Sequence, residues 1–503
     1  MLGQEKASPE YSGVAAKPET VDVDMLFVPV FEGTDALEDL PGLDAATGGD
    51  ISRARESSEF RARLYELFIA RVTGGPYRAV RVALVGAGPR EDADAERLRR
   101  IAAACSYTAR IRSMRSAAFV VRVGLDPVRG AEIGADGMTA AEFDTGTYKS
   151  DRDAGEFPER IVIVSPAADP AALAEAVFRG QTLGASSNVT RALANEPSNV
   201  LTPRVFAERV AAVATDVGLQ VEVLDEQQIR DLKMGLLLGV AQGSAEPPRL
   251  VVIRHDPPGA PETPVLGFIG KGITFDTGGV SIKPADGMER MKYDMSGGAA
   301  VAGAMRALAL LKAPRRIIGV IPMAENMVGG KAVRPGDVLT AASGTTVEII
   351  NTDAEGRLIL GDAIWYAQEL GATHLVDIAT LTGACMVALG RTSSGLFGTP
   401  DAWVGTVQNA GTVAGDRLWH LPLHEEYREL LKSEIADMLN SAGRWAGAST
   451  AAMFLREFVK DRPWAHLDIA GTAWAEECRA YQAKGATGVA VRTLIELGLR
   501  TEI

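Results

Sequence analysis

The chain has 503 residues, of which 47% are hydrophobic and 23% are charged. This is the usage of an ordinary globular protein, so the composition excludes a mostly disordered, collagen-like or coiled-coil chain. Its formal net charge of −13 removes the simplest electrostatic reason to expect a nucleic-acid-binding protein. The sequence has no apolar run near the ~20 residues that span a bilayer, and its three cysteines are far apart. We therefore expect a cytoplasmic protein with reduced thiols and no membrane partner.

The first part of the chain predicts a small α/β domain over residues 21–168, after a polar lead-in over 1–20. Short β-rich runs alternate there with helical patterns, which is typical of such domains. The expected strands are Met25–Val30, Val80–Val85, Phe119–Val123 and Ile161–Val164, and one expected helix is Asp92–Ala109.

Two further segments complete the first half. Gly134–Glu156 is rich in glycine and aspartate and predicts surface loops. Asp169–Glu196 has a long helical pattern that stops before Pro197, so we expect residues 169–200 to connect the two halves.

Residues 201–503 predict a second, larger α/β domain with a central mixed, largely parallel sheet. Strand and helix patterns alternate again, and such sheets hold their ligands at the carboxyl ends of the strands. Two expected helices are Gly297–Lys312, with Ser296 as its N-cap, and Leu358–Leu370. The expected strands are Leu250–Ile253, Val265–Ile269, Ile317–Ile321, Val347–Ile350, Leu375–Leu381 and His466–Ile469.

Charged side chains gather in a glycine-rich segment, Gly267–Gly298, that follows an apolar strand pattern. They are Lys271, Asp276, Lys283 and Asp294. Each of them alone is most simply a solvated loop charge. The set carries more weight, because a second acidic cluster follows.

That second cluster is Asp353, Glu355 and Arg357, directly after the expected strand Val347–Ile350. In an extended backbone, residues i, i+2 and i+4 share one face, so the three side chains would point the same way. The acids could simply pair with Arg357. However, Asp276 and Asp294 offer more carboxylates than one arginine balances, and four carboxylates in a chain with five histidines suit a pair of divalent ions.

The two segments, GKGITFDTGGVSIKP with MKYDMSGG and NTDAEGRL, resemble the leucyl aminopeptidase (cytosol aminopeptidase) family of two-metal exopeptidases. NEPSNVLTP at Asn195–Pro203 and HLDIAGTAW at His466–Trp474 match as well. MGLLLGVAQGS and DIATLTGA extend the match over most of the second half, whereas the first half resembles the family only loosely.

The resemblance implies a metalloprotease that uses two metal ions, zinc or manganese. Lys271, Asp276, Asp294 and Glu355 would bind the tighter ion, and Asp276, Asp353 and Glu355 the more exchangeable one. As a ligand, Lys271 must be neutral, and two adjacent dications would lower the pKa of its amine. Lys283 would stabilise the oxyanion of the reaction, and Arg357 would hold a bicarbonate ion as general base.

The resemblance also implies what the protein acts on and how it assembles. A metal-activated water would release N-terminal amino acids, preferably leucine-like, from peptides with a free N-terminus. Met291, Thr380 and Gly383 would line the pocket for the first side chain, although core packing is the simpler reading of Met291 and Thr380. A homohexamer is expected from the resemblance alone.

The function of a DNA-binding or architectural protein stays open as an alternative. Arg53, Arg55, Arg61 and Arg63 could form a local basic stripe, or a solvated helix face interleaved with acids. A catalytically inactive relative is a third reading, which the complete set of site residues disfavours. The residue pattern does not select among zinc, manganese, magnesium and cobalt, and it does not identify the physiological peptide.

Overall fold

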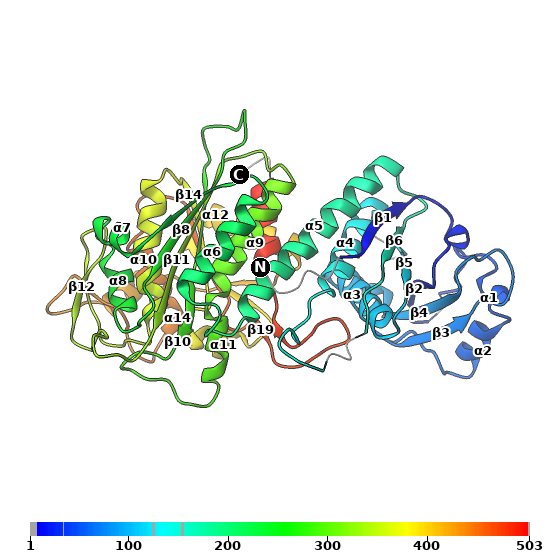
Figure 1. Ribbon diagram of the computed structural model, residues 1–503, viewed down its shortest axis with the longest axis horizontal. Helices are drawn as coiled ribbons and strands as arrows, with labels where there is room; N and C mark the ends of the chain where they lie inside the picture. Colours follow the sequence, from blue (N-terminus) through cyan, green and yellow to red (C-terminus); the bar gives the residue numbers. More distant parts are fainter. Residues whose placement is uncertain (1–7, 34, 123–125, 152–154, 501–503) are drawn as a thin grey trace. The chain divides into compact units, whose positions relative to one another are not determined.

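The computed structural model describes residues 8–33, 35–122, 126–151 and 155–500. The chain divides into two compact units (Figure 1). Unit 1 contains the described residues up to Asn188 together with Glu476–Lys484, and unit 2 contains the rest. The division falls inside helix α5 (Pro170–Asn195), the long helix expected over 169–196. Glu476–Lys484 groups with unit 1, although it lies within the 201–503 segment that we expected to form one domain.

Unit 1 is built on a six-stranded sheet in the order β1-β6-β5-β2-β4-β3. Every neighbouring pair is parallel except β3 with β4. The strands are β1 (Glu10–Val14), β2 (Met25–Phe31), β3 (Leu67–Arg71), β4 (Arg81–Gly88), β5 (Ser116–Val120) and β6 (Arg160–Val164). The helices are α1 (Leu43–Ala46), α2 (Asp50–Glu56), α3 (Ala95–Ile111) and α4 (Pro127–Ala140).

Strand β2 explains why this sheet is covered on both faces. Met25 and Phe27 pack into a core with Leu98 of α3, whereas Leu26 and Val28 pack into a second core with the short helices α1 and α2. Successive side chains of a strand point to opposite faces, so a continuous apolar run is buried twice.

Three expectations for unit 1 are corrected. Residues 10–14 are not a loose lead-in, because they form β1 and pair in parallel with β6. The first part of Gly134–Glu156 is not loop, because it completes α4, whose small residues are buried against α3. Helix α2 ends at Glu56, so the four arginines from Arg53 to Arg63 do not share one helix face. Residues 1–7, Val123 and 152–154 of the expected segments lie outside the described residues.

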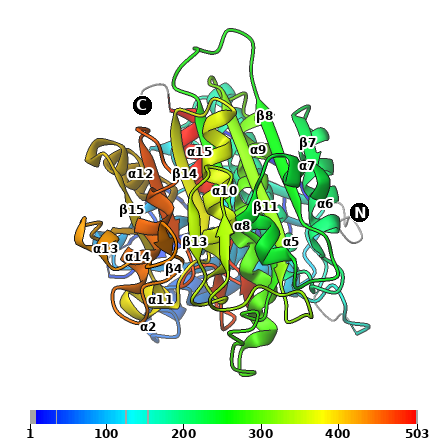
Figure 2. The same ribbon diagram turned by 90° about the vertical axis from the view of Figure 1, so that its left-hand side faces the viewer.

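Unit 2 is built on a nine-stranded mixed sheet (Figure 2), in the order β16-β15-β18-β14-β9-β11-β8-β7, with β10 paired to β11. The central pairs β18-β14, β14-β9 and β9-β11 are parallel, as expected. The strands are β7 (Gln220–Leu224), β8 (Arg249–His255), β9 (Leu266–Gly270), β10 (Gly272–Asp276), β11 (Ile317–Asn326), β14 (His374–Ala379), β15 (Ser394–Thr399), β16 (Leu418–His420) and β18 (Trp464–Asp468).

Helices lie on both faces of this sheet. Helices α6, α9 and α12 cover one face, with α15 packed against α9 and α12, and α8, α10 and α14 cover the other face. Their bounds are α6 (Pro203–Thr215), α8 (Gly235–Ala241), α9 (Ser296–Leu310), α10 (Glu355–Glu369), α12 (Asp401–Ala414), α14 (Gly447–Arg456) and α15 (Val491–Leu499). The smaller elements are α7 (Glu226–Asp231), α11 (Gly383–Leu389), α13 (Glu426–Glu429), a 3-10 segment η3 (Met288–Met295), and strands β12 (Val338–Thr340), β13 (Thr346–Glu348), β17 (Met438–Leu439), β19 (Trp474–Ala475) and β20 (Gly485–Ala486).

Two helix starts differ from expectation. Helix α9 includes Ser296, whose hydroxyl donates to the carbonyl of Tyr293 instead of capping the helix, and Met295 occupies the N-cap. Helix α10 begins at Glu355, three residues before the expected Leu358. None of the helices among the described residues is long and apolar enough to cross a membrane.

Candidate metal centre

The strand ends of unit 2 position one side of the candidate centre. Lys271 lies between β9 and β10, Asp276 ends β10, and Thr380 directly follows β14. Strands β9, β14 and β10 all belong to the parallel part of the sheet, so their carboxyl ends meet at one edge. This is the edge at which open α/β sheets bind ligands.

The other side of the centre comes from segments outside the sheet. Asp294 lies in η3, Asp353 lies in the turn before α10, and Glu355 is the first residue of α10. The expected extended arrangement of the second cluster is wrong. Asn351 accepts a hydrogen bond from the Asp353 amide (3.0 Å) and from the Ala354 amide (3.2 Å), which bends the chain into the helix.

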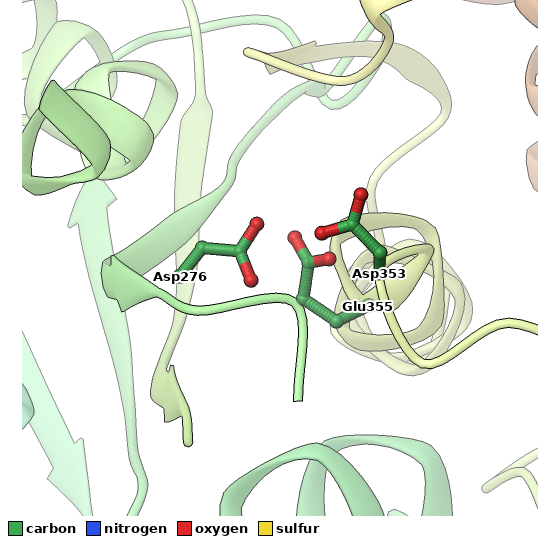
Figure 3. A group of neighbouring side chains, drawn as sticks. All are labelled: Asp276, Asp353 and Glu355. Carbon is green, nitrogen blue, oxygen red and sulfur yellow. The ribbon is translucent and has the colours of Figure 1, made fainter. Parts of the chain in front are cut away.

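The carboxylates of Asp276, Asp353 and Glu355 converge (Figure 3). Each offers one oxygen atom, and these atoms lie within 4.8 Å of one another. Asp276 and Glu355 are buried, and Asp353 is partly exposed. Like charges this close repel unless cations lie among them.

Lys271 is one of those cations. Its Nζ atom lies 2.7 Å from Asp294 Oδ2 and 2.8 Å from Glu355 Oε1, and its side chain is 3% exposed. It also donates to the main-chain carbonyl of Thr380 at 3.0 Å. Burial lowers the pKa of Lys271, but Asp294, Glu355 and Asp276 raise it by more, so the amine is held as an ammonium while no metal ion competes.

Lys283 is the second cation. Its Nζ atom lies 2.8 Å from Asp276 Oδ2 and 2.6 Å from Asp353 Oδ1. Its side chain is 22% exposed, so it is far more accessible than Lys271. Burial lowers the pKa of Lys283, and the carboxylates around it raise the pKa by more. The described ion pairs of the acids are therefore made with lysines, and not with Arg357 as one alternative required.

Burial and the nearby carboxylates disfavour the charged forms of Glu355 and Asp294. Burial raises the pKa of Glu355 to about 8, and the charge of Asp276 adds to the effect. Burial likewise raises the pKa of Asp294 to about 6, although the Lys271 ammonium opposes the rise. Glu355 Oε2 is buried and has no hydrogen-bond partner among the described residues. An oxygen-rich set with an unpaired buried oxygen fits a divalent cation.

Asn326 is a site residue that the sequence reading missed. It ends β11, and its Nδ2 donates to Asp276 Oδ1 (2.8 Å) and to the Thr352 carbonyl (3.0 Å). The Gly278 amide also donates to Asp276 Oδ1, at 2.8 Å. These bonds fix the orientation of the Asp276 carboxylate. The position of Asn326 at the carboxyl end of a central strand is the feature that could have identified it as a site residue.

Arg357 lies in the first turn of α10 and is buried. Its Nη1 donates to the Asn440 carbonyl at 3.0 Å, and its Nε has no partner among the described residues. Burial lowers the pKa of Arg357 to about 10, against the opposing effect of Glu355, Asp468 and Asp353. The guanidinium therefore keeps donor capacity for an anion.

The three residues expected to line a side-chain pocket lie on different segments. Met291 is partly exposed in η3, and Gly383 is exposed at the start of α11, where a Cβ atom would meet nothing within 4 Å. Thr380 is buried, and its hydroxyl donates to Asp294 Oδ1 at 2.6 Å. Thr380 thus contacts an expected metal ligand directly, which the sequence reading did not foresee.

Comparisons with known proteins find one family that matches both halves of the chain. The model of the cytosol aminopeptidase family, catalytic domain, matches residues 188–495, and the model of that family's N-terminal domain matches residues 27–152. The chain is 45% identical to a probable cytosol aminopeptidase of Koribacter versatilis, over 95% of this chain and 97% of that protein. It is 47% identical to a protein of the same description from Solibacter usitatus, with the same shares covered.

Solved structures are also similar. A mutant of tomato leucine aminopeptidase superposes with a TM-score of 0.89 at 31% identity, over 99% of this chain and 98% of that chain. The bottromycin maturation enzyme BotP in complex with Mn has a TM-score of 0.83 at 36% identity, over 95% of this chain and 99% of that chain.

Proposed function

Because the chain belongs to the cytosol aminopeptidase family, and is therefore a hydrolase, we propose that it uses two divalent metal ions, zinc or manganese, to release N-terminal amino acids. The single observation that carries the metal proposal is the convergence of Asp276, Asp353 and Glu355 within 4.8 Å. We propose that leucine-like N-terminal residues are preferred and that the range of accepted residues is broad.

We assign the ligands residue by residue. Lys271, Asp276, Asp294 and Glu355 would bind the tighter ion, and Asp276, Asp353 and Glu355 the more exchangeable one. The unpaired Glu355 Oε2 and the raised pKa of Glu355 support its role as a bridge, because a cation would relieve both. When bound, the ions would polarise the peptide carbonyl and lower the pKa of a water molecule.

Lys271 must change state when an ion binds. Its ammonium now neutralises Asp294 and Glu355, and an ammonium has no lone pair for a ligand bond. Metal binding would therefore release its proton, as metal sites commonly do. The Thr380 carbonyl, 3.0 Å from Lys271 Nζ, would keep the amine in place afterwards.

Lys283 and Arg357 would act on the reaction itself. Lys283 is charged and 22% exposed, so a substrate oxygen that gains negative charge can reach its ammonium. Arg357 has an unpartnered buried Nε, which supports a bound bicarbonate as general base. Both residues supply positive charge beside a reaction that generates negative charge.

The amino-terminal specificity follows from the same site. A free α-amine offers a neutral lone pair, whereas an internal or blocked peptide offers none. We assign Met291, Thr380 and Gly383 to the pocket for the first side chain, and the open space above Gly383 leaves room for one. Peptides with a free N-terminus are therefore the proposed substrates.

Matched peptides test this proposal. A leucine-initiated peptide with a free amine and its N-acetylated copy are incubated with the purified chain loaded with Mn²⁺, and the products are followed by mass spectrometry. We expect stepwise loss of residues from the free peptide alone. Equal cleavage of the acetylated copy would reject an aminopeptidase mechanism, and a chain stripped by chelator serves as the control for metal dependence.

We further propose a homohexamer in the cytoplasm, which rests on the family resemblance. Sedimentation velocity tests the assembly, because a hexamer has six times the mass of one chain and sediments faster.

A further inference from the structure

Asp468, the last residue of β18, is a buried carboxylate outside the proposed ligand set. Its side chain accepts four hydrogen bonds. Oδ2 accepts from the Thr382 hydroxyl at 2.7 Å. Oδ1 accepts from the main-chain amides of Leu381 (3.2 Å), Thr382 (3.4 Å) and Ala470 (3.1 Å). Both oxygens thus accept hydrogen bonds within the protein, and Asp468 is not among the three carboxylates that converge at the candidate centre.

The segment that Asp468 holds is also the segment that contacts the metal centre. Residues 380–382 join β14 to α11. Thr380, at the start of this segment, accepts from Lys271 Nζ through its carbonyl (3.0 Å) and donates to Asp294 Oδ1 through its hydroxyl (2.6 Å). Asp468 bonds one end of this segment, and Thr380 at its other end bonds the assigned ligands Lys271 and Asp294.

Residues 380–382 are held by hydrogen bonds to the sheet and to helix α11. Strands β14 and β18 pair in parallel, with Ala379 opposite Asp468, and the Ile469 amide donates to the Ala379 carbonyl at 2.9 Å. The Thr382 hydroxyl also accepts from the Cys385 amide at 2.9 Å, which caps α11. The loop is consequently fixed at both ends, by the sheet and by the helix.

We propose that Asp468 is a positioning residue that sets the geometry of Lys271 and Asp294 through Thr380. Residues that orient metal ligands from behind typically change metal affinity by 10- to 100-fold when they are replaced. The inference rests on the proposed function, because the geometry of Lys271 and Asp294 matters only if the chain binds a divalent ion.

Manganese titration of the full chain tests the proposal without reference to turnover. Free Mn²⁺ gives a sharp electron paramagnetic resonance signal, so its loss on binding counts sites and yields each dissociation constant. Asp468→Asn keeps the shape but replaces an acceptor with a donor that faces the Thr382 hydroxyl. We expect it to weaken the tighter Mn²⁺ site by about 10- to 100-fold.

A second pair of variants removes the partner instead of the carboxylate. Thr382→Val keeps the shape of the side chain and deletes the hydroxyl, whereas Thr382→Ser keeps the hydroxyl. We expect Thr382→Val to weaken the tighter site as Asp468→Asn does, and Thr382→Ser to retain the parent affinity. Thr382→Ser with the same loss as Thr382→Val would overturn the proposal.

Asp362→Asn is the matched control for general destabilisation. Asp362 is fully buried and also accepts main-chain hydrogen bonds, from Leu236 (3.0 Å), Leu237 (3.0 Å) and Ala342 (2.8 Å). The hydrogen bonds described for these groups do not involve Lys271 or Asp294. We expect this variant to melt at a lower temperature but to bind Mn²⁺ as the parent does, with all titrations run well below every melting point.

The outcomes separate the two proposals. Parent-like Mn²⁺ affinity in Asp468→Asn and Thr382→Val would overturn the positioning role and leave the proposed function intact. An equal loss in Asp362→Asn would also overturn it, because affinity would then follow stability alone. A parent chain that binds neither Mn²⁺ in this titration nor Zn²⁺ by metal analysis would instead refute the proposed function.

Discussion

The two lysines of the centre are both positively charged but differ in burial. Lys271 is 3% exposed and Lys283 is 22% exposed, and each lies between two carboxylates. A buried amine between assigned ligands can exchange its proton for a metal ion, whereas an accessible ammonium can meet a substrate. The difference in burial is therefore the reason for proposing two different roles for the two lysines.

At the residue scale, the bridging assignment predicts unequal effects of similar substitutions. Asp276→Asn and Glu355→Gln should each lower the content of both ions, because each side chain is assigned to both. Asp353→Asn should lower the content of the exchangeable ion only. Metal analysis after gel filtration, paired with turnover, checks this. Retention of two ions with near-parent activity in Glu355→Gln would reject the bridge.

Arg357 carries a separate prediction at this scale. Arg357→Ala should lower kcat by about 10²- to 10⁴-fold, the usual cost of losing a general base, while the metal content stays at the parent level. Bicarbonate added to a carbonate-depleted parent should raise its rate, and Arg357→Ala should not respond.

Lys283→Ala is the comparison for that measurement. It should lose about 10²- to 10³-fold in kcat through the missing oxyanion contact and should still respond to bicarbonate. Loss of metal in proportion to activity, in either variant, would make its role one of supporting the ions.

At the element scale, the hydrophobic pattern was informative where strands are buried on both faces. Strands β2 and β9 were predicted within one residue because each is an uninterrupted apolar run. Strand β14 was predicted within two residues, although the buried Asp377 interrupts its apolar run. β1 was missed because its residues are mostly half-exposed and polar. The start of α10 was missed because Asn351 bends the chain through hydrogen bonds that periodicity does not encode.

The site shows the same limit. The charged residues proposed for it were singled out from a motif, because their order along the chain is distinctive. Asn326 and Asp468 were not, because their roles come from strand neighbours that are far apart in the sequence. Only the sheet register brings them to the centre.

A tether between two elements of unit 1 predicts a pH dependence. The Tyr11 hydroxyl of β1 donates to Glu142 Oε1 at 2.7 Å, just after α4. Burial raises the pKa of Glu142 to about 7, although hydrogen bonds from Tyr11 and Ser8 oppose the rise. The usual pKa of a glutamate is about 4.3. Between about pH 4.3 and about pH 7, Glu142 therefore keeps its proton in the folded chain and has lost it in the unfolded chain.

The sign follows from that difference in bound protons. The contribution of Glu142 to stability falls as pH rises through this window. Glu142→Gln stays neutral and lacks the fall, so the melting temperature of the parent should decline relative to the variant between pH 5 and pH 8. Differential scanning fluorimetry on both chains measures it, and a constant difference across that range would contradict the raised pKa.

At the scale of the whole molecule, the net charge bears on the DNA-binding alternative. The net charge of −13 repels a phosphate backbone. The candidate basic stripe is weaker than the sequence suggested, because Arg53 pairs with Asp50 at 3.0 Å and α2 ends before Arg61 and Arg63. Non-specific DNA binding at physiological salt rests on phosphate contacts and has dissociation constants of about 10⁻⁴ to 10⁻⁶ M.

We therefore predict no saturable binding of duplex DNA at micromolar chain concentration in about 0.15 M salt. A gel-shift titration across salt concentrations measures this, with a variant in which Arg53, Arg55, Arg61 and Arg63 are serine as the comparison. The two chains should behave alike, since Arg53 is already paired with Asp50 and charges farther apart than the Debye length of about 8 Å are largely screened. Tight binding by the parent, lost steeply with salt and absent in the variant, would instead show that these arginines form a phosphate-binding surface despite the net charge.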